Sequence, residues 1–270
     1  MYLCDHHSHT HFSFDGSETP EALCEAAIRN GVAELSITDH YDIDGITEGI
    51  YTPYRADEAK EAILAVKERY AGRLRVNYGI ELGQANHMPK ESEAFIKKYG
   101  FDFVLGSIHN LRNVPDFCFM KYEEMSDRLI EQLIERSLDE ILEIAHLDYI
   151  TSLAHITYPH RYATLAHREV DLMKFTDRFR AIFRAIIERG IALEINTSTL
   201  RTAGITMPTY PVFRLYRECG GELITFGSDS HKAEYIGYRI DEAQKALSDM
   251  GFAYQTVIRD GTPCPIPLEY

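Results

Sequence analysis

The chain of 270 residues has no tryptophan and no long apolar run. None of its apolar stretches approaches the about 18 residues that a membrane-spanning helix needs. Its start, Met-Tyr-Leu-Cys-Asp-His, also lacks the basic and apolar segments of a secretory signal. We therefore expect a cytoplasmic protein that does not engage a membrane.

Cysteine is scarce and scattered. The five cysteines contain no Cys-x-x-Cys pair. Cysteines that are odd in number, widely separated and unpaired in the sequence argue against a disulfide framework and against a zinc ribbon, and they fit a reducing compartment. They stand at Cys4, Cys24, Cys118, Cys219 and Cys264.

Basic residues are few relative to acidic ones. The chain has 28 Lys and Arg against 42 Asp and Glu, which gives a formal net charge of −14. Proteins that coat nucleic acid bind mainly by neutralising phosphates, so this balance argues against a nucleic-acid partner. It leaves room for one small anion at a local site. With 45% hydrophobic and 26% charged residues, the chain has the composition of a globular domain.

What the chain does contain is an alternation of two kinds of segment. Short runs rich in Val, Ile, Leu and aromatic residues predict seven buried strands. They cover residues 1–4, 33–38, 74–80, 103–108, 149–154, 191–195 and 222–226. Segments of helical period follow them, at residues 20–30, 54–70, 90–99, 121–145, 169–189, 209–218 and 240–250. This order predicts an α/β fold with parallel strands, either a closed barrel or an open doubly wound sheet.

Residues able to bind metal stand where the predicted strands end. Eight of them follow six of the seven strands: His7, His9, His40, Glu81, His109, His155, Asp229 and His231. An open sheet uses two or three strand ends at its switch point, whereas a barrel gathers nearly all of them at one mouth. The pattern therefore favours a seven-stranded barrel over residues 1–270, with a short tail at 253–270.

Imidazoles and carboxylates packed together indicate metal chemistry. Unshielded carboxylates repel one another, and both groups are ligands of Zn, Mn and Fe. Eight ligands exceed the needs of one ion. They fit two divalent transition-metal ions, or three if Asp15 folds back from the loop after the first strand.

In the residues at its predicted strand ends, the chain resembles the PHP family, named for polymerase and histidinol phosphatase. The motifs that carry the resemblance are Asp5-x-His7-Ser8-His9-Thr10, Thr38-Asp39-His40, Glu81, His109, His155 and Asp229-Ser230-His231. The family fold is a distorted (β/α)7 barrel similar to a TIM barrel, with its metal site at the carboxyl ends of the strands. Within the family, the length and the opening motif are most similar to stand-alone histidinol-phosphate phosphatases.

The resemblance implies a ligand set for each ion. One ion would be held by His7, His9, Glu81 and Asp229. A second would share Glu81 and add His109 and His155, and a third would use Asp15, His40 and His231. The implied reaction is hydrolysis of a phosphate monoester by a metal-bridging hydroxide, in histidine biosynthesis. Asp229, His40 and His231 are the candidate catalytic residues, and the sequence does not decide which group protonates the leaving oxygen.

Substrate-binding candidates come from the loops at the same mouth. A phosphate dianion suits arginine, and Arg161 and Arg201 follow the fifth and sixth strands. Histidinol phosphate also carries an amine, for which Asp42, or else Asp44 or Glu48, could provide a carboxylate.

Three other functions stay open. A PHP-type nuclease would share the metal cluster but needs a basic track, which this chain lacks. A phosphatase of another small phosphoester or nucleotide fits equally well. A non-catalytic metal sensor would use protein ligands to fill every coordination position of its ion, whereas this mouth also has arginines and polar loops beside the ligands. The sequence does not indicate the oligomeric state.

Overall fold

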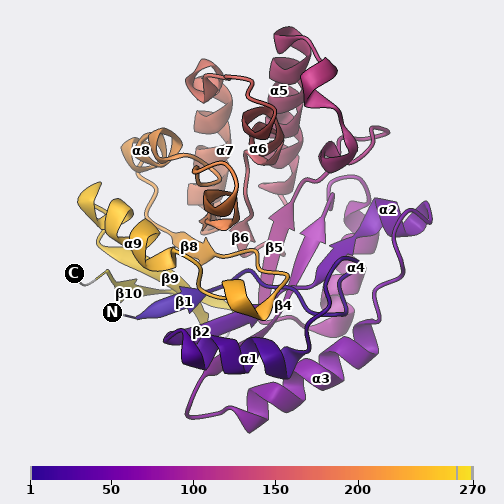
Figure 1. Ribbon diagram of the computed structural model, residues 1–270, viewed down its shortest axis with the longest axis vertical. Coiled ribbons are helices and arrows are strands. Elements are labelled where there is room, and N and C mark those ends of the chain that lie inside the picture. The colour runs from indigo at the N-terminus through magenta and orange to yellow at the C-terminus, as the bar shows by residue number, and fades with distance from the viewer. Residues whose placement is uncertain (1, 260, 269–270) are drawn as a thin grey trace.

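Seven parallel strands form a nearly closed barrel in the computed structural model, which describes residues 2–259 and 261–268 (Figure 1). In sheet order they are β1 (Leu3–Asp5), β2 (Val32–Ile37), β4 (Arg75–Gly83), β5 (Phe103–Ser107), β6 (Ser152–Leu153), β7 (Ala192–Asn196) and β8 (Ile224–Gly227). The barrel closes where the backbone N–H of His6 donates to the carbonyl of Phe226 at 2.8 Å. The predicted barrel is confirmed, although its first strand was placed from Met1, which lies outside the described residues.

Helices surround the barrel (Figure 1). Those predicted are α1 (Pro20–Arg29), α3 (Ala56–Arg69), α4 (Pro89–Tyr99), α5 (Asp127–Ile144), α7 (Thr176–Arg189), α8 (Tyr210–Glu218) and α9 (Ile240–Asp249). The predicted segment 121–145 begins instead with a 3₁₀ turn, Tyr122–Glu124, and the α-helix starts after Ser126, whose side chain accepts from the N–H of Leu129. No helix in the described part of the chain is both long and apolar enough to cross a bilayer.

The amphipathic helix α5 illustrates how the outer core is built. Its buried residues include Ile130, Ile134, Leu138 and Ile141, which recur every three or four positions and so form one face. They pack in one large apolar cluster together with side chains of β5 and α7. Each fully buried Leu or Ile stabilises the fold by about 1.5–3 kcal/mol.

Three short elements at the carboxyl end of the barrel were not predicted from the sequence. Strand β3 (His40–Asp42) pairs with β4 and brings His40 opposite Glu81. Helix α6 (Tyr158–Leu165) follows β6, with Pro159 in its first turn. Both are too short to show a clear period in the sequence, and both contribute residues at the carboxyl end of the barrel. The third element, the small helix α2 (Ile43–Thr47), follows β3 directly.

The predicted tail is instead an antiparallel hairpin, β9 (Tyr254–Arg259) and β10 (Thr262–Pro267). Ile258 packs with Phe103, Leu105 and Ala154. Prolines at 263, 265 and 267 suit an edge strand, because proline has no N–H to donate to a further strand. The hairpin therefore belongs to the fold, and the Asp-Gly pair at 260–261 was its signal in the sequence.

A partly buried ion triad ties α5 to α2 and to the loop after β4. The ring of His87 lies between Asp44 Oδ2, 2.8 Å from Nδ1, and Glu140 Oε2, 2.6 Å from Nε2. Burial on its own would lower the pKa of His87, but the hydrogen bonds to both carboxylates raise it to about 9. The imidazolium is thus the bridge between these segments.

The triad makes stability depend on pH. Because the folded pKa of His87 lies above its ordinary value of about 6.5, its stabilisation is complete below about pH 6.5 and is lost as pH rises through about 9. We expect His87→Gln to lower the free energy of unfolding by about 1–2 kcal/mol at pH 6, because solvent screens this partly buried group, with a much smaller loss at pH 9.5. Urea unfolding of both proteins between pH 6 and pH 9.5 measures this difference in the free energy of unfolding. The control, His146→Gln, changes an exposed ring and is expected to give no such trend; a pH-independent loss in His87→Gln would refute this role.

Candidate metal centre

The carboxyl ends of the strands meet at one mouth, where six imidazoles and three carboxylates lie together. The segment after β1 carries His7 and His9, β3 carries His40, and β4 carries Glu81. The others follow β5, β6 and β8 or come from the loop before α1: His109, His155, Asp229, His231 and Asp15. All nine predicted ligands are therefore brought into one cluster.

One group within the cluster is formed by His7, His9, Glu81 and Asp229, all of which are buried. The Nε2 atom of His7 lies 3.1 Å from Glu81 Oε2 and 3.7 Å from Asp229 Oδ1. The Nε2 atom of His9 lies 3.5 and 3.4 Å from the same two oxygens. Two ligand atoms each about 2.1 Å from a tetrahedral ion lie about 3.4 Å apart. The imidazole–carboxylate distances among these four side chains thus match the spacing of ligands around a single ion, and His7, His9 and Asp229 form one compact set of ligand atoms.

Glu81 links this group to the next one. Its second oxygen, Oε1, lies 2.8 Å from His155 Nε2 and 3.1 Å from His109 Nε2. One carboxylate that faces histidines on both of its oxygens is suited to bridge two cations.

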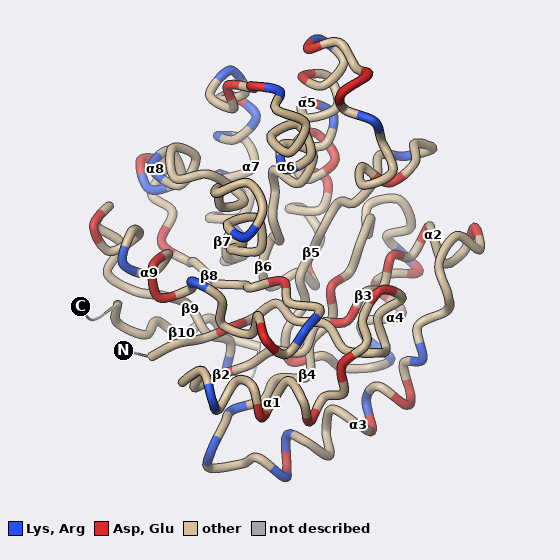
Figure 2. The backbone as a smooth tube through the Cα atoms, viewed as in Figure 1, with Lys and Arg blue, Asp and Glu red and all other residues tan. Residues whose placement is uncertain are grey.

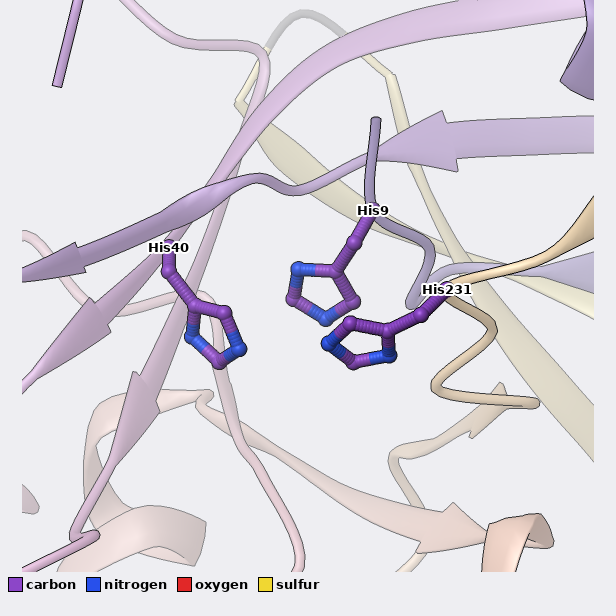
Figure 3. Close-up of side chains that lie close together, drawn as sticks. All are labelled: His9, His40 and His231. Atoms are coloured by element: carbon purple, nitrogen blue, oxygen red, sulfur yellow. The ribbon is translucent and has the colours of Figure 1, made fainter. Parts of the chain in front are cut away.

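A third group lies towards the rim. Figure 3 shows the rings of His9, His40 and His231 facing one another, and each of the three offers a nitrogen to a common point. The ring centroids of His9 and His231 are 4.1 Å apart. Asp15, which is partly exposed, approaches the same group: its Oδ2 lies 3.0 Å from His231 Nε2.

Several buried atoms of the cluster have no hydrogen-bond partner of adequate geometry among the described residues. They are His7 Nε2, His9 Nε2, His40 Nδ1, Glu81 Oε2 and His231 Nε2. Orphaned buried polar atoms are costly unless another species satisfies them. Their donor chemistry and mutual distances fit divalent transition-metal ions.

The electrostatics of the cluster point the same way. Burial opposes ionisation of Glu81, yet the surrounding histidines hold its pKa well below the usual range. Burial likewise disfavours a charged His7, but Glu194, Glu81 and Asp229 raise its pKa well above the ordinary value. Without metal, protons on His7, His40 and His109, whose pKa values the neighbouring carboxylates raise, compensate the carboxylates. Divalent cations would replace those protons, so metal binding releases protons here.

Two residues of the cluster have left-handed backbone conformations. The φ angles of His155 and Asp229 are +25° and +50°. Such angles are strained for residues other than glycine and persist where the surrounding structure enforces them, often at functional sites.

Buried carboxylates behind the cluster hold the histidine rings. Asp42 Oδ1 lies 2.7 Å from His109 Nδ1, and its other oxygen lies 3.4 Å from His40 Nδ1. From the sequence, Asp42 was expected at the mouth as a partner of the substrate amine. In the structure β3 pairs with β4 and turns Asp42 inward, where it is fully buried beneath the rings and does not line the mouth pocket. Asp44, one of the two alternatives, is bound to His87 and Asn110, and neither it nor Glu48 lines the mouth pocket.

Glu194 was missed by the sequence analysis. Its Oε1 lies 2.7 Å from His7 Nδ1, and its Oε2 accepts from the backbone N–H of His155 at 2.8 Å. Gly227 leaves the space for this contact, because a Cβ there would lie 2.2 Å from Glu194 Oε1 and 2.5 Å from the Cβ of His7. An ionisable residue inside an otherwise apolar strand was the available signal.

Glu194→Gln tests this positioning role. A glutamine keeps the size of the side chain but removes the charge that fixes the His7 ring, so we expect metal affinity to fall about 10- to 100-fold. Competition with a chromophoric chelator measures that affinity. The matched control is Glu188→Gln, which changes an exposed residue of α7. Unchanged affinity in Glu194→Gln would contradict the assignment.

A pocket of about 350 Å³ opens above the cluster. Both predicted substrate-binding arginines line it, together with Tyr158, Tyr162 and Ser198. Arg161 Nε and one terminal nitrogen of Arg201 are buried without a hydrogen-bond partner among the described residues. The pocket thus combines the metal-ligand cluster with two guanidinium groups that have free donors.

Fold and site together define a class: a β/α-barrel protein with a divalent-metal site at the carboxyl ends of its strands. A family model described as the PHP domain matches residues 5–198. The chain belongs to the PHP family, and the resemblance noted in the sequence is confirmed.

Curated relatives match over nearly the whole chain. A Clostridium acetobutylicum protein named "Probable histidinol-phosphatase" is 30% identical over 241 residues, covering 89% of this chain and 91% of that protein. A Lactococcus lactis protein named histidinol-phosphatase is 25% identical over 257 residues, covering 93% of each chain.

A solved structure matches the fold. Histidinol phosphate phosphatase of Lactococcus lactis, in complex with zinc, L-histidinol and phosphate, aligns with a TM-score of 0.80 at 22% identity and covers 97% of this chain and 98% of its own. At that identity the likeness establishes the fold, the distorted (β/α)7 barrel.

Proposed function

We propose that the chain is a cytoplasmic, metal-dependent phosphate monoester hydrolase of histidine biosynthesis. Its reaction is the conversion of L-histidinol phosphate and water to L-histidinol and phosphate. The observation that carries this proposal is the mouth pocket, in which Arg161 and Arg201 present unpaired guanidinium donors beside the cluster of imidazoles and carboxylates.

The nine clustered side chains would hold two or three ions of zinc, manganese or iron. His7, His9, Glu81 and Asp229 would bind the first. Glu81, His109 and His155 would bind the second, and Asp15, His40 and His231 the third. No thiolate belongs to these sets, so donor softness does not select one of the three metals.

When bound, the divalent ions lower the pKa of coordinated water and neutralise the charge of the phosphoryl group. The residues of the chain orient the substrate for in-line attack. Arg161 and Arg201 bind the phosphoryl oxygens by charge-assisted hydrogen bonds. Asp229 and the rings of His40 and His231 line the pocket in which the phosphoryl group would lie. With only the first two ions bound, either ring would keep a free nitrogen and could donate a proton to the leaving oxygen.

The relatives support the substrate. Proteins named histidinol-phosphatase are 25–30% identical over most of the chain, and the structure with the matching fold was solved with L-histidinol and phosphate. A small phosphorylated substrate also fits a pocket of about 350 Å³ better than a polynucleotide does.

A substrate panel on metal-reconstituted protein tests the proposal. It contains histidinol phosphate, nucleoside monophosphates, sugar phosphates and single-stranded DNA. We expect phosphate release from histidinol phosphate to dominate by kcat/KM. Equal or faster turnover of another small phosphoester would make the chain a different PHP phosphatase, and cleavage of the DNA would make it a nuclease.

A further inference from the structure

A second pocket lies at the opposite end of the barrel, with a volume of about 530 Å³. It is bordered by the connection between α3 and β4, by the start of β2 and by the end of β9. Four cationic residues line it: Lys67, Arg73, Arg75 and Arg259. No Asp or Glu is among its described lining residues, although the chain as a whole carries a net charge of −14.

Two of the four cations form ion pairs with carboxylates outside the pocket lining. Both terminal nitrogens of Arg259 bond the fully buried carboxylate of Glu34, at 2.6 and 2.5 Å. Lys67 Nζ lies 2.5 Å from Asp102 Oδ2. These pairs hold two cationic side chains at the pocket wall in fixed positions, but their charges are already balanced.

The other two cations have no counter-charge within the described part of the chain. Neither Arg73 nor Arg75 has a carboxylate within 4.0 Å, and both are exposed; the guanidinium of Arg73 lies 5.7 Å from the ring of Tyr70. Figure 2 shows basic residues along the connection between α3 and β4. Cations gathered in a concave surface attract anions and repel one another unless an anion binds.

The floor of the pocket is apolar. Tyr2 and Ala33 keep part of their surface accessible and Ala71 is exposed, whereas Leu74 and Val76 are buried in the core, with 3% and 1% of their surface exposed. An anion alone would leave this floor uncovered. A molecule with an apolar body and an anionic group would contact the floor and the guanidinium groups together.

This pocket is distinct from the metal centre. Strand β4 runs from one to the other, and the five residue steps from Val76 to Glu81 span about 16 Å at 3.3 Å per residue. A small molecule at the mouth does not reach it.

We propose that this pocket is a second binding site for a small phosphorylated molecule, with Arg73 and Arg75 binding the phosphate and Tyr2, Ala33 and Ala71 contacting its apolar body. Arginine suits a phosphate because its planar fork presents two parallel donors.

Titration calorimetry of the metal-loaded protein with phenylphosphonate tests the site. Phenylphosphonate is a dianion with an apolar ring and has no phosphoester bond to hydrolyse. We expect two sites per chain, one at each pocket. Arg73→Gln combined with Arg75→Gln is expected to weaken one site at least tenfold, while Arg161→Gln combined with Arg201→Gln weakens only the other.

The matched control is Arg128→Gln with Arg136→Gln, two exposed arginines of α5, which should retain both sites. Methylphosphonate, which lacks the ring, should bind the second pocket more weakly than phenylphosphonate does. A single site in the wild-type protein that depends on Arg161 and Arg201 would overturn the proposal. So would a second site that persists unchanged in the Arg73/Arg75 double variant.

Discussion

Replacing His7 by alanine is expected to remove most of the bound metal and to lower kcat/KM for histidinol phosphate at least about a thousandfold, or about 4 kcal/mol. His7 contacts Glu81 and Asp229 through Nε2 and Glu194 through Nδ1. Its loss removes a ligand, and it also leaves the buried Glu194 without its imidazole partner. Metal content by plasma mass spectrometry and steady-state phosphate release measure the two effects.

A matched histidine separates this effect from a general loss of folding. His11 lies four residues further on, where its ring packs against Phe12 at an angle of 35° and its Nδ1 lies 3.1 Å from the carbonyl of Glu18. His11→Ala should keep both metal and activity. Circular dichroism establishes that the His7 variant is folded. A folded His7→Ala protein with full metal content and activity would show that the ligand assignment is wrong.

Arg161→Ala is expected to lower kcat/KM for histidinol phosphate about 10- to 100-fold and to leave the metal content unchanged. A hydrogen bond to a charged group contributes about 1.5–3 kcal/mol, and each 1.4 kcal/mol is a factor of ten. The effect should appear mainly as a higher KM and as weaker inhibition by inorganic phosphate, because the guanidinium binds the phosphoryl group of the substrate and the free phosphate ion alike. Steady-state kinetics with phosphate as inhibitor measure it.

Arg112 provides the control for that variant. It follows β5, but its guanidinium donates to the backbone carbonyls of Asn86 and His87 and does not line the mouth pocket. Arg112→Ala should therefore leave KM unchanged. If Arg161→Ala loses metal, or if it keeps wild-type KM and phosphate inhibition, Arg161 does not bind the phosphoryl group.

Much of the metal centre was predictable because the ends of parallel strands converge in a barrel. Once the strands ending near Thr38, Ile80 and Ile108 were recognised, the next His or Glu in each case had to face the mouth. The nine clustered residues are the nine predicted ones. The His7-Ser8-His9 pair also followed from the two-residue period of extended chain.

The residues behind the ligands were less predictable because their roles depend on contacts distant in sequence. Glu194 is 187 positions from His7. The residues next to Glu194 in the sequence do not show whether its side chain contacts the metal cluster or only supports the strand. Asp42 was misplaced because β3 was not foreseen: its pairing with β4 puts Asp42 on the same inward face as His40.

Metal titration of the apo protein tests the central claim most directly. Zinc or manganese is added stepwise to chelator-treated protein, and bound metal and phosphate release from histidinol phosphate are measured in the same samples. We predict no significant release from the metal-free protein and full activity only after at least two ions bind per chain. Equal activity in the metal-free protein, or full activity at a single ion per chain, would contradict the account.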